Sequence, residues 1–170
     1  VTVAVPHNLQ GAVASRAAEP TFLPLAESSP GVVSLDAAAR ILDNLAGYSA
    51  LLVGCGIGQA PTTRELVERL LFSDAQLPPT VVDADALNIL SVSQRDGGNW
   101  CETYTSNAVL TPHPGEMARL TGMSTAAIQD DRVGTAVESA SRWNKVVVLK
   151  GAHTVVATPS GKTMISPFAN

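Results

Sequence analysis

The chain has 170 residues, a net charge of −4 and an apolar fraction of 45 %, while aromatic residues contribute only 4 %. This composition fits one globular domain whose core is filled by Val, Leu, Ile and Ala. Lysine and arginine are spaced singly, which excludes the broad basic face that nucleic-acid binding requires. No apolar run reaches the roughly 18 residues of a membrane helix. Cys55 and Cys101 lack metal-ligand spacing. We therefore expect a soluble, cytoplasmic protein with two free thiols and no membrane partner.

The chain begins with a strand-like run at 1–5, followed by a helix at about 9–17 and an extended segment at 21–25. Ser34 is a good helix N-cap, because its side chain can accept a hydrogen bond from a free backbone N–H. The helix after it would place four apolar residues on one stripe, namely Ala38, Ile41, Leu42 and Leu45. Gly47 is expected to end that helix.

Residues 50–53 form a continuous apolar run, which predicts a strand buried on both faces. A glycine-rich turn at 54–58 follows, and then a helix at about 62–72. The buried stripe of that helix would consist of Leu66, Val67, Leu70 and Leu71. Residues 80–82 predict the next strand.

The second half of the chain continues the same alternation of strands and helices. A helix is predicted at 86–90, then a loop at 96–99 and a strand at 108–110. A short helix follows, whose first turn holds Pro114 and Glu116, and then a long helix capped by Ser124. The last predicted elements are strands at 145–149, 154–157 and 162–165. The long helix should carry Val133, Val137 and Ala140 on its inner side. This βαβ order predicts an α/β fold with a mainly parallel sheet.

The turn Gly54-Cys55-Gly56-Ile57-Gly58 lies between a buried strand and a helix. Glycines allow close approach of a ligand and positive φ angles, and helix N-termini attract anions. The spacing matches neither a Rossmann fingerprint nor a P-loop. Ligand contact and simple tight packing therefore both remain open for this turn.

Two carboxylates, Asp83 and Asp85, stand where a strand ends and a helix begins, with Asn88 one turn further along. Ligands of open α/β sheets bind at this carboxyl edge. Helix capping would account for one of the two carboxylates. The pair together with Asn88 favours a functional role.

The strongest local feature is the segment Thr111-Pro112-His113-Pro114-Gly115-Glu116, which follows a strand directly. The two prolines restrict the backbone around His113, so its ring has a defined position. A lone histidine is often only structural, but this position at a strand end favours ligand contact. Glu116 could serve the site or neutralise the helix N-terminus.

Lys150 and Gly151 follow the buried run 146–149 in the same way. Lys150 could contact a phosphate or could simply be solvated at the strand end. Right-handed crossovers bring the ends of parallel strands to one edge, so the four polar turns predict a cleft suited to a polar, phosphorylated molecule.

In this order, the four segments resemble the motifs of the NAD(P)H-hydrate dehydratases, the carbohydrate-kinase-related family of the ribokinase-like superfamily. The family pattern is similar to G-P-G-[LI]-G, D-A-D-A-L-N, T-P-H-P-G-E-x-x-R-L and L-K-G-x-x-T. The matching segments here are 54–58, 83–88, 111–120 and 149–154. The resemblance covers essentially the whole chain, and the T-P-H-P-G-E element is highly specific.

The resemblance implies repair of hydrated NADH or NADPH by phosphorylation of the added hydroxyl from ADP or ATP, with Mg²⁺, and elimination of phosphate. The residues it assigns to the hydrated dinucleotide are Gly56, Gly58, Asp85, Asn88 and His113. Those it assigns to the adenine nucleotide are Lys150, Gly151, Ala152, His153 and Thr154. A homo-oligomer, often a tetramer, and a fused or partnered epimerase domain are further implications.

The sequence departs from the family pattern in three places. Cys55 replaces the usual proline, the expected G-T-G-D element with its catalytic Asp is absent, and so is the segment expected before Val1. We therefore expect residues 1–170 to form a single incomplete ribokinase-like domain, a three-layer sandwich lacking its terminal parts. Two alternatives remain open, a ribokinase-like kinase of a hydroxymethylpyrimidine or hydroxyethylthiazole type, and a non-catalytic nucleotide-binding module.

Overall fold

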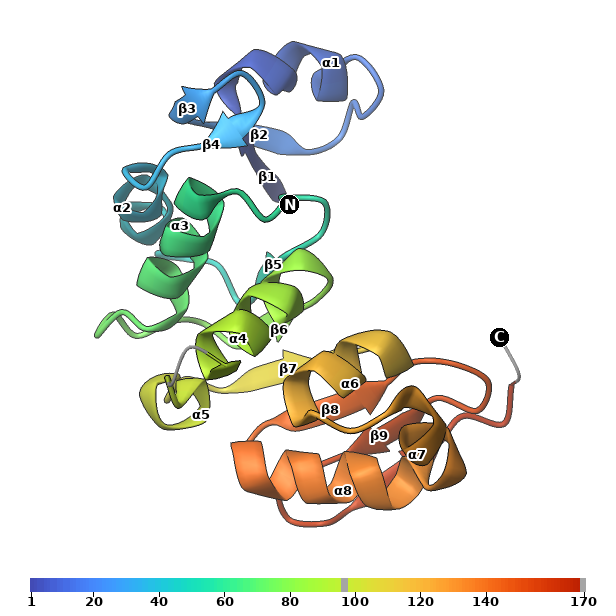
Figure 1. Cartoon of the computed structure of the whole chain (residues 1–170). Coiled ribbons are helices and arrows are strands. Elements are labelled where there is room, and N and C mark those ends of the chain that lie inside the picture. Colours follow the sequence, from blue (N-terminus) through green and yellow to red (C-terminus); the bar gives the residue numbers. More distant parts are fainter. Residues whose placement is uncertain (96–97, 169–170) are drawn as a thin grey trace. The chain divides into compact units, whose positions relative to one another are not determined.

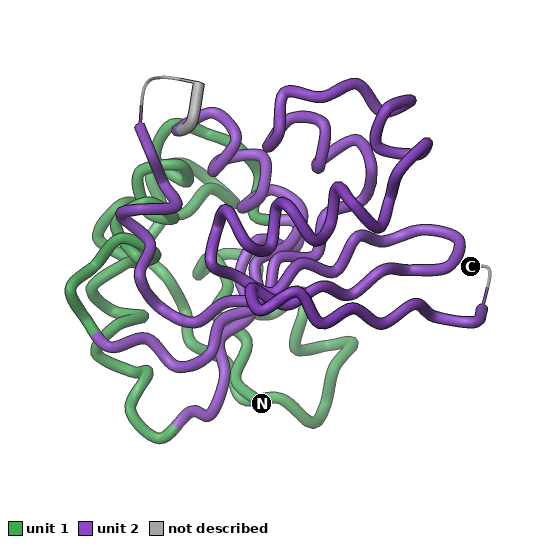
Figure 2. Tube along the Cα trace, turned by 90° about the horizontal axis from the view of Figure 1, so that it is seen from below, with its two compact units in different colours: residues 1–47, 57–75 green, residues 48–56, 76–170 purple. Residues whose placement is uncertain are grey.

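The computed structural model describes residues 1–95 and 98–168, which form two compact units (Figures 1 and 2). Unit 1 consists of Val1–Gly47 and Ile57–Ala75, and unit 2 of Tyr48–Gly56 and Gln76–Asn170. Residues 96 and 97 of the predicted loop, and the last two residues of the chain, lie outside the described residues. Each unit is considered by itself below.

Unit 1 contains two small sheets and its helices. Its elements are β1 (Thr2–Pro6), the 3₁₀ helix η1 (His7–Leu9), α1 (Gln10–Ala14), β2 (Thr21–Leu25), β3 (Glu27–Ser29), β4 (Val32–Val33), α2 (Ala37–Asp43) and α3 (Pro61–Leu71). Strands β1 and β2 pair in parallel, and β3 and β4 pair antiparallel. Helix α3 confirms the predicted helix, and the stripe expected there is buried.

The helix after Ser34 differs from its prediction. Ser34 is not the N-cap, because its side-chain hydroxyl is buried and accepts no hydrogen bond from the helix, while its backbone N–H donates to the Ala26 carbonyl at 2.9 Å. Helix α2 begins only after Asp36 and ends at Asp43. The Asn44 side chain donates to the Arg40 carbonyl at 2.8 Å and so satisfies a carbonyl of the last turn. Leu45 and Gly47 therefore lie beyond the helix.

Unit 2 is built on one sheet with the strand order β10-β9-β8-β7-β6-β5. Strands β5 to β8 are parallel, and β9 and β10 are antiparallel additions. The elements are β5 (Leu51–Val53), β6 (Thr80–Val82), α4 (Asp85–Arg95), α5 (Trp100–Thr103), β7 (Ala108–Leu110), α6 (Pro114–Thr121), α7 (Thr125–Asp130), α8 (Arg132–Trp143), β8 (Val146–Leu149), β9 (Val155–Ala157) and β10 (Thr163–Ile165). The predicted mainly parallel sheet is confirmed.

Helices α6 and α8 lie on the same side of this sheet (Figure 1). The strand residues that face the core are buried, namely Val53, Val82, Leu110, Val147, Leu149, Val155 and Ala157. Helices α5 and α8 pack through Trp100 and Trp143, whose ring centroids are 5.5 Å apart.

The long helix predicted after Ser124 is in fact two helices. Ser124 caps α7 as expected, and its side chain accepts from the Ala127 N–H at 3.1 Å. The chain then breaks at Asp131, whose side chain accepts from the Gly134 N–H at 2.7 Å and starts α8. This second cap shifts the inner face of the helix. Val133 is consequently 39 % exposed instead of buried.

The opposite sheet face is apolar but only partly covered. Strand register places seven residues on this valine face, namely Leu52, Val81, Val109, Val146, Val148, Val156 and Met164. The five valines are half-buried, whereas Leu52 is 61 % and Met164 73 % exposed. The prediction that the first strand of this sheet is buried on both faces was therefore wrong, because Leu52 of β5 lies on the partly covered face. Within the described ranges, no helix combines the length and apolarity that crossing a membrane demands.

Candidate functional site

The ends of three neighbouring strands are joined by backbone hydrogen bonds. Val82 and Leu110 are register partners at the ends of β6 and β7. The Thr111 N–H donates to the Val82 carbonyl at 3.2 Å, and the Lys150 N–H donates to the Pro112 carbonyl at 2.9 Å. The residues that follow β6, β7 and β8 therefore meet at one edge of the sheet.

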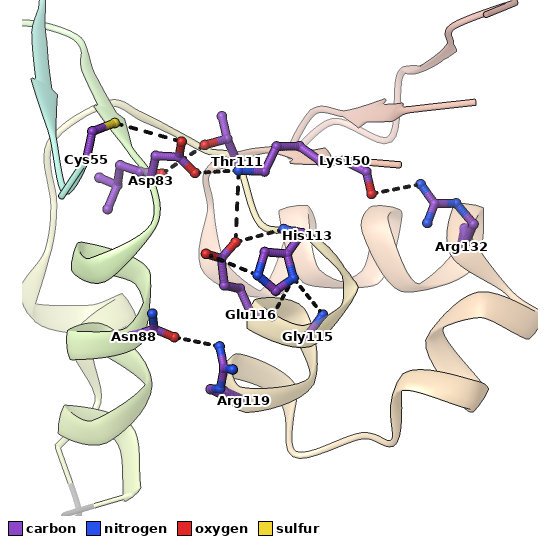
Figure 3. A network of polar contacts seen from close by, with 11 residues as sticks. Cys55, Asp83, Asn88, Thr111, His113, Gly115, Glu116, Arg119, Arg132 and Lys150 are labelled. Atoms are coloured by element: carbon purple, nitrogen blue, oxygen red, sulfur yellow. Dashed lines mark hydrogen bonds and ion pairs between the residues drawn. The ribbon is translucent and has the colours of Figure 1, made fainter. Parts of the chain in front are cut away.

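Lys150 is the centre of the polar network at this edge (Figure 3). Its Nζ lies 2.7 Å from Oδ1 of Asp83 and 4.0 Å from Oε2 of Glu116. The Sγ of Cys55 lies 3.9 Å from the other Asp83 oxygen. Lys150 therefore forms an ion pair. The alternative from the sequence, a lysine that is merely solvated at the strand end, is excluded.

The charge of Asp83 is stabilised despite partial burial. Burial alone would raise the pKa of this carboxyl group, but hydrogen bonds from Lys150 and Thr111 and the positive charge of Lys150 outweigh it. The net effect lowers the pKa of Asp83 below its ordinary value of 3.8. At neutral pH, Asp83 is a carboxylate and Lys150 is its counter-ion.

His113 and Glu116 form a reciprocal cap at the start of α6. Nδ1 of His113 accepts from the backbone N–H groups of Gly115 and Glu116, at 2.9 and 3.3 Å. The Glu116 carboxylate accepts a hydrogen bond from the backbone N–H of His113 at 2.8 Å. Its other oxygen lies 3.5 Å from Nε2 of His113. This arrangement is a capping box, with a histidine in the place of the usual Ser or Thr.

Because Nδ1 accepts hydrogen bonds, the cap requires the His113 tautomer that carries its proton on Nε2. The side chain of His113 is 50 % exposed, while that of Glu116 is 6 % exposed. The ring can therefore contact a ligand while it caps the helix. Capping and ligand binding are both compatible with this geometry.

The glycine-rich turn after β5 combines two kinds of glycine. Gly54 has φ +120°, and a Cβ there would overlap the Asp83 carbonyl oxygen and lie 2.8 Å from Cβ of Ala86. Gly56 has φ +68°, and a Cβ would meet no atom within 4 Å. Tight packing thus explains Gly54, whereas Gly56 needs glycine only for its backbone conformation and is exposed.

Helix α4 starts beside this turn. Asp85 is its first residue, and the Asp85 N–H donates to the Gly54 carbonyl at 3.1 Å. One turn later, Oδ1 of Asn88 accepts from Arg119 of α6 at 2.7 Å. Asn88 therefore connects α4 to the helix that carries the His113 cap (Figure 3).

The turn after β8 requires unusual backbone angles. Gly151 has φ +136°, and His153, although not a glycine, has φ +54°. Oγ1 of Thr154 donates to the Gly151 carbonyl at 3.0 Å. The His153 N–H donates to the Phe168 carbonyl at 3.2 Å. Ala152 is exposed at the tip of this turn.

Of the residues predicted for the site, His113 and Lys150 share one network within unit 2, and Gly56, Asp85 and Asn88 lie in elements of that unit. Gly58 belongs to unit 1 and is exposed there, with φ +75°.

The structure adds Thr111, Arg119 and Arg132, which sequence reasoning did not assign to the site. It also brings in Asp83 and Glu116, for which a role in the site and helix capping had both been open. Asp83 and Thr111 directly follow paired strand ends, which was a usable signal. Arg132 lies far along the chain and gave none.

Curated relatives match most or all of the chain. A bifunctional NAD(P)H-hydrate repair enzyme of Moorella thermoacetica is 43 % identical over 174 residues, covering 100 % of this chain and 31 % of the relative. An ADP-dependent (S)-NAD(P)H-hydrate dehydratase of Neisseria meningitidis is 38 % identical over 126 residues, covering 72 % of this chain and 40 % of the relative. The chain thus spans less than half the length of these relatives.

Solved structures agree with the fold. The ADP/ATP-dependent NAD(P)H-hydrate dehydratase from Bacillus subtilis, co-crystallised with ATP and Mg²⁺ and soaked with CoA, has a TM-score of 0.72 at 26 % identity. The match covers 99 % of this chain and 55 % of that one. A ribokinase-like superfamily protein from Enterococcus faecalis has a TM-score of 0.74 at 17 % identity, over 99 % of this chain and 53 % of its own, and supports the fold alone.

The family model described as NAD(P)H-hydrate dehydratase, of the carbohydrate-kinase type, matches residues 12–170. That range includes all four sequence segments and every member of the Lys150 network. The chain therefore belongs to the NAD(P)H-hydrate dehydratase family and has its ribokinase-like α/β fold.

Proposed function

We propose that the complete protein restores hydrated NADH or NADPH to the reduced cofactor at the expense of ADP or ATP. The phosphoryl group would pass from the nucleotide to the hydroxyl oxygen of the hydrated ring, with loss of the hydroxyl proton and release of the shortened nucleotide. The C–O bond would then break with release of phosphate, while the adjacent ring carbon loses a proton and the ring double bond re-forms. Family membership and the ADP-dependent relatives support this proposal. It concerns the complete protein, since the chain spans about a third to a half of its relatives.

The observation that carries the proposal is the contact of three strand ends through Asp83, His113 with Glu116, and Lys150 in unit 2. A ligand at this edge would meet a half-exposed imidazole, a carboxylate and an ammonium group together. In the proposal, His113 contacts the hydrated dinucleotide, as do Gly56, Asp85 and Asn88 of the same unit. The base that the family pattern supplies in its G-T-G-D element would come from another part of the complete protein.

The adenine nucleotide would bind the turn of residues 150–154. Lys150 is already paired with Asp83, so a nucleotide phosphate would compete with a carboxylate for its ammonium group. Gly151 and His153 of this turn have positive φ angles, and Ala152 and His153 are exposed. We therefore propose that main-chain groups of the turn contribute strongly to nucleotide binding, with Lys150 as an electrostatic partner.

Mg²⁺ would accompany the nucleotide phosphates and offset the charge on the transferred group. Protein sites for Mg²⁺ commonly use one or two carboxylates together with substrate phosphates. The described residues contain no group of three or more His, Cys, Asp or Glu side chains able to hold a metal ion. Asp83 is the closer of the two carboxylates that flank Lys150, and it would fit such a shared site.

We further propose that residues 1–170 form part of one larger ribokinase-like domain and that the complete protein is a cytoplasmic homo-oligomer, with a tetramer as the expected state. An epimerase domain in the same polypeptide, or a separate epimerase partner, would complete the repair. The name of the bifunctional relatives supports a second activity beside this one.

The test uses the complete polypeptide with hydrated NADH, Mg²⁺ and either ADP or ATP. Return of NADH absorbance with release of phosphate supports the proposal. A stable phosphate ester without NADH would instead identify a kinase of a small vitamin precursor. Binding of nucleotide without any turnover of hydrated NADH or of a hydroxylated vitamin precursor would favour a non-catalytic nucleotide-binding module.

A further inference from the structure

Arg132 links the start of α8 to the turn after β8 (Figure 3). Its Nη2 donates to the carbonyl oxygens of Leu149 at 3.0 Å and Lys150 at 3.3 Å. Its Nη1 donates to Oε1 of Gln129 at 2.9 Å. A cation at the first residue of a helix faces the positive end of the helix dipole, which is unfavourable. These hydrogen bonds offset that cost and hold the guanidinium group in place.

The guanidinium group also packs against Gly151. A Cβ at Gly151 would lie 3.2 Å from both Nη atoms, which is closer than ordinary van der Waals contact. Gly151 has φ +136°, a conformation that side chains rarely adopt. Arg132 and the backbone of Gly151 thus occupy adjoining space, and each limits the movement of the other.

We propose that Arg132 is a positioning residue that fixes the turn of residues 150–154 for adenine-nucleotide binding. By holding two successive carbonyl oxygens, it sets the peptide orientation that directs Lys150 to Asp83, at 2.7 Å. Because the Lys150 carbonyl and the Gly151 N–H belong to one planar peptide group, the same restraint determines where the Gly151 N–H points. This inference rests on the proposed function, because it assigns the nucleotide to this turn.

The planar fork of arginine suits this task better than lysine. A guanidinium group presents several N–H donors in a fixed plane, whereas an ammonium group is a compact charge on a flexible stem. Lysine at this position would keep the positive charge but lose the two-carbonyl bridge together with the contact to Gln129. Charge alone would therefore not restore the position of the turn.

The experiment compares Arg132→Ala and Arg132→Lys in the complete polypeptide, with Arg142→Ala as the matched control. Arg142 lies in the last turn of the same helix and is exposed. Affinities for ADP and ATP are measured by calorimetry well below the melting temperature of each variant. We expect both Arg132 variants to bind nucleotide roughly tenfold more weakly, and Arg142→Ala to bind as the wild type does.

Chemical rescue separates positioning from general destabilisation. Millimolar guanidinium, far below denaturing concentrations, should restore nucleotide affinity to Arg132→Ala, whereas sodium chloride at the same ionic strength should not. Guanidinium should have no effect on the wild type or on Arg142→Ala. If Arg132→Ala proves unfolded, Arg132→Lys with its retained stem carries the affinity comparison.

Wild-type affinity in the Arg132 variants would overturn the inference, and so would failure of guanidinium to restore a folded Arg132→Ala. A wild-type protein that binds ADP or ATP but does not repair hydrated NADH would overturn the proposed function alone, and the affinity comparison would still decide the role of Arg132. A wild-type protein that binds neither nucleotide would overturn both.

Discussion

At the scale of single residues, Lys150 is held between two carboxylates of different exposure. Asp83 is the closer partner at 2.7 Å, and the more deeply buried Glu116 lies at 4.0 Å while also capping α6. Two negative groups around one cation leave net negative charge at the site. An incoming nucleotide phosphate therefore needs a further positive charge, which Mg²⁺ can supply.

Asp83→Asn should reduce stability by about 0.5–1 kcal/mol at neutral pH, because the ion pair is partly exposed and screened by solvent. The folded-state pKa of Asp83 lies below its ordinary value of 3.8, so its contribution is present above that value and is lost as pH falls through the folded-state pKa. Urea unfolding of both proteins from pH 3 to pH 7 checks this prediction. The difference should be constant above about pH 5 and shrink towards the acid end; a difference that grows on acidification would contradict it.

His113 caps α6, and we propose that it also contacts substrate; substitutions can separate the two roles. His113→Ala removes the Nδ1 acceptor that serves Gly115 and Glu116, which should cost about 1 kcal/mol of stability. His113→Asn keeps a capping oxygen but removes the imidazole ring. We expect Asn to restore most of the unfolding free energy while the affinity for hydrated NADH stays weak in both variants.

Calorimetry with hydrated NADH and chemical denaturation are carried out on His113→Ala and His113→Asn. The loss of binding free energy should exceed the loss of unfolding free energy. Full substrate affinity in His113→Asn would show that capping is the only task of this residue.

How far the site can be read from sequence depends on how local each contact is. His113 and Lys150 were predicted to lie close together because each comes after a predicted parallel strand, and the structure joins both to one network through Glu116. For Asp83 the sequence favoured a functional role over capping, but its pairing with Lys150 spans 67 positions and depends on side-chain rotamers that a pattern does not encode. The role of Arg132 could not be predicted, because it contacts backbone carbonyl groups. Every residue has such a group, so no residue type in the sequence marks the contact.

At the scale of elements, the strands were predictable and the helix ends were less so. Short β-branched runs bounded by turn residues predicted β6, β7 and β8 almost to the residue. The long helix was misjudged because Asp131 offers a second cap within one continuous polar–apolar pattern. A helix cap contributes only about 1 kcal/mol. The spacing of apolar residues therefore does not show whether a helix continues or ends at such a residue.

Asp131→Ala should destabilise the protein by about 1 kcal/mol, because it removes the acceptor for the Gly134 N–H at 2.7 Å. Asp130→Ala is the matched control, since Asp130 is the exposed last residue of α7, where a negative charge faces the negative end of the helix dipole. Its stability should be unchanged or slightly higher. Thermal denaturation of both variants checks the pair, and equal losses would mean that Asp131 does not define the start of α8.

The glycine turn after β5 gives a second matched pair. Gly54→Ala should cost about 3 kcal/mol or more, because unfavourable φ is combined with overlap on the Asp83 carbonyl and Ala86. Gly56→Ala should cost about 1 kcal/mol, since only its positive φ is unfavourable for alanine. Denaturant unfolding measures both. Similar losses at the two positions would contradict the packing role assigned to Gly54.

At the scale of the whole molecule, unit 2 has one sheet face packed under helices and a valine face that remains half-exposed. The resemblance to a three-layer fold predicted helices on both faces of the sheet. Central positions of a parallel sheet are normally buried on both sides. The proposal of a larger domain therefore has a physical basis in the valine face itself, since five β-branched side chains in register favour burial.

Met164→Glu tests whether the valine face is covered in the complete protein. In residues 1–170 alone, Met164 is 73 % exposed, so the added charge should leave stability within about 0.5 kcal/mol and reduce self-association. If Met164 is covered in the complete polypeptide, the new carboxylate would be buried or would disrupt the packing above it. The free energy of unfolding should then fall by several kcal/mol. Val133→Glu on the helical side, 39 % exposed, is the control and should be nearly neutral in both forms. Denaturation with sedimentation analysis distinguishes the cases, and a Met164→Glu protein that is equally stable in both forms would mean that this end of the valine face stays open to solvent.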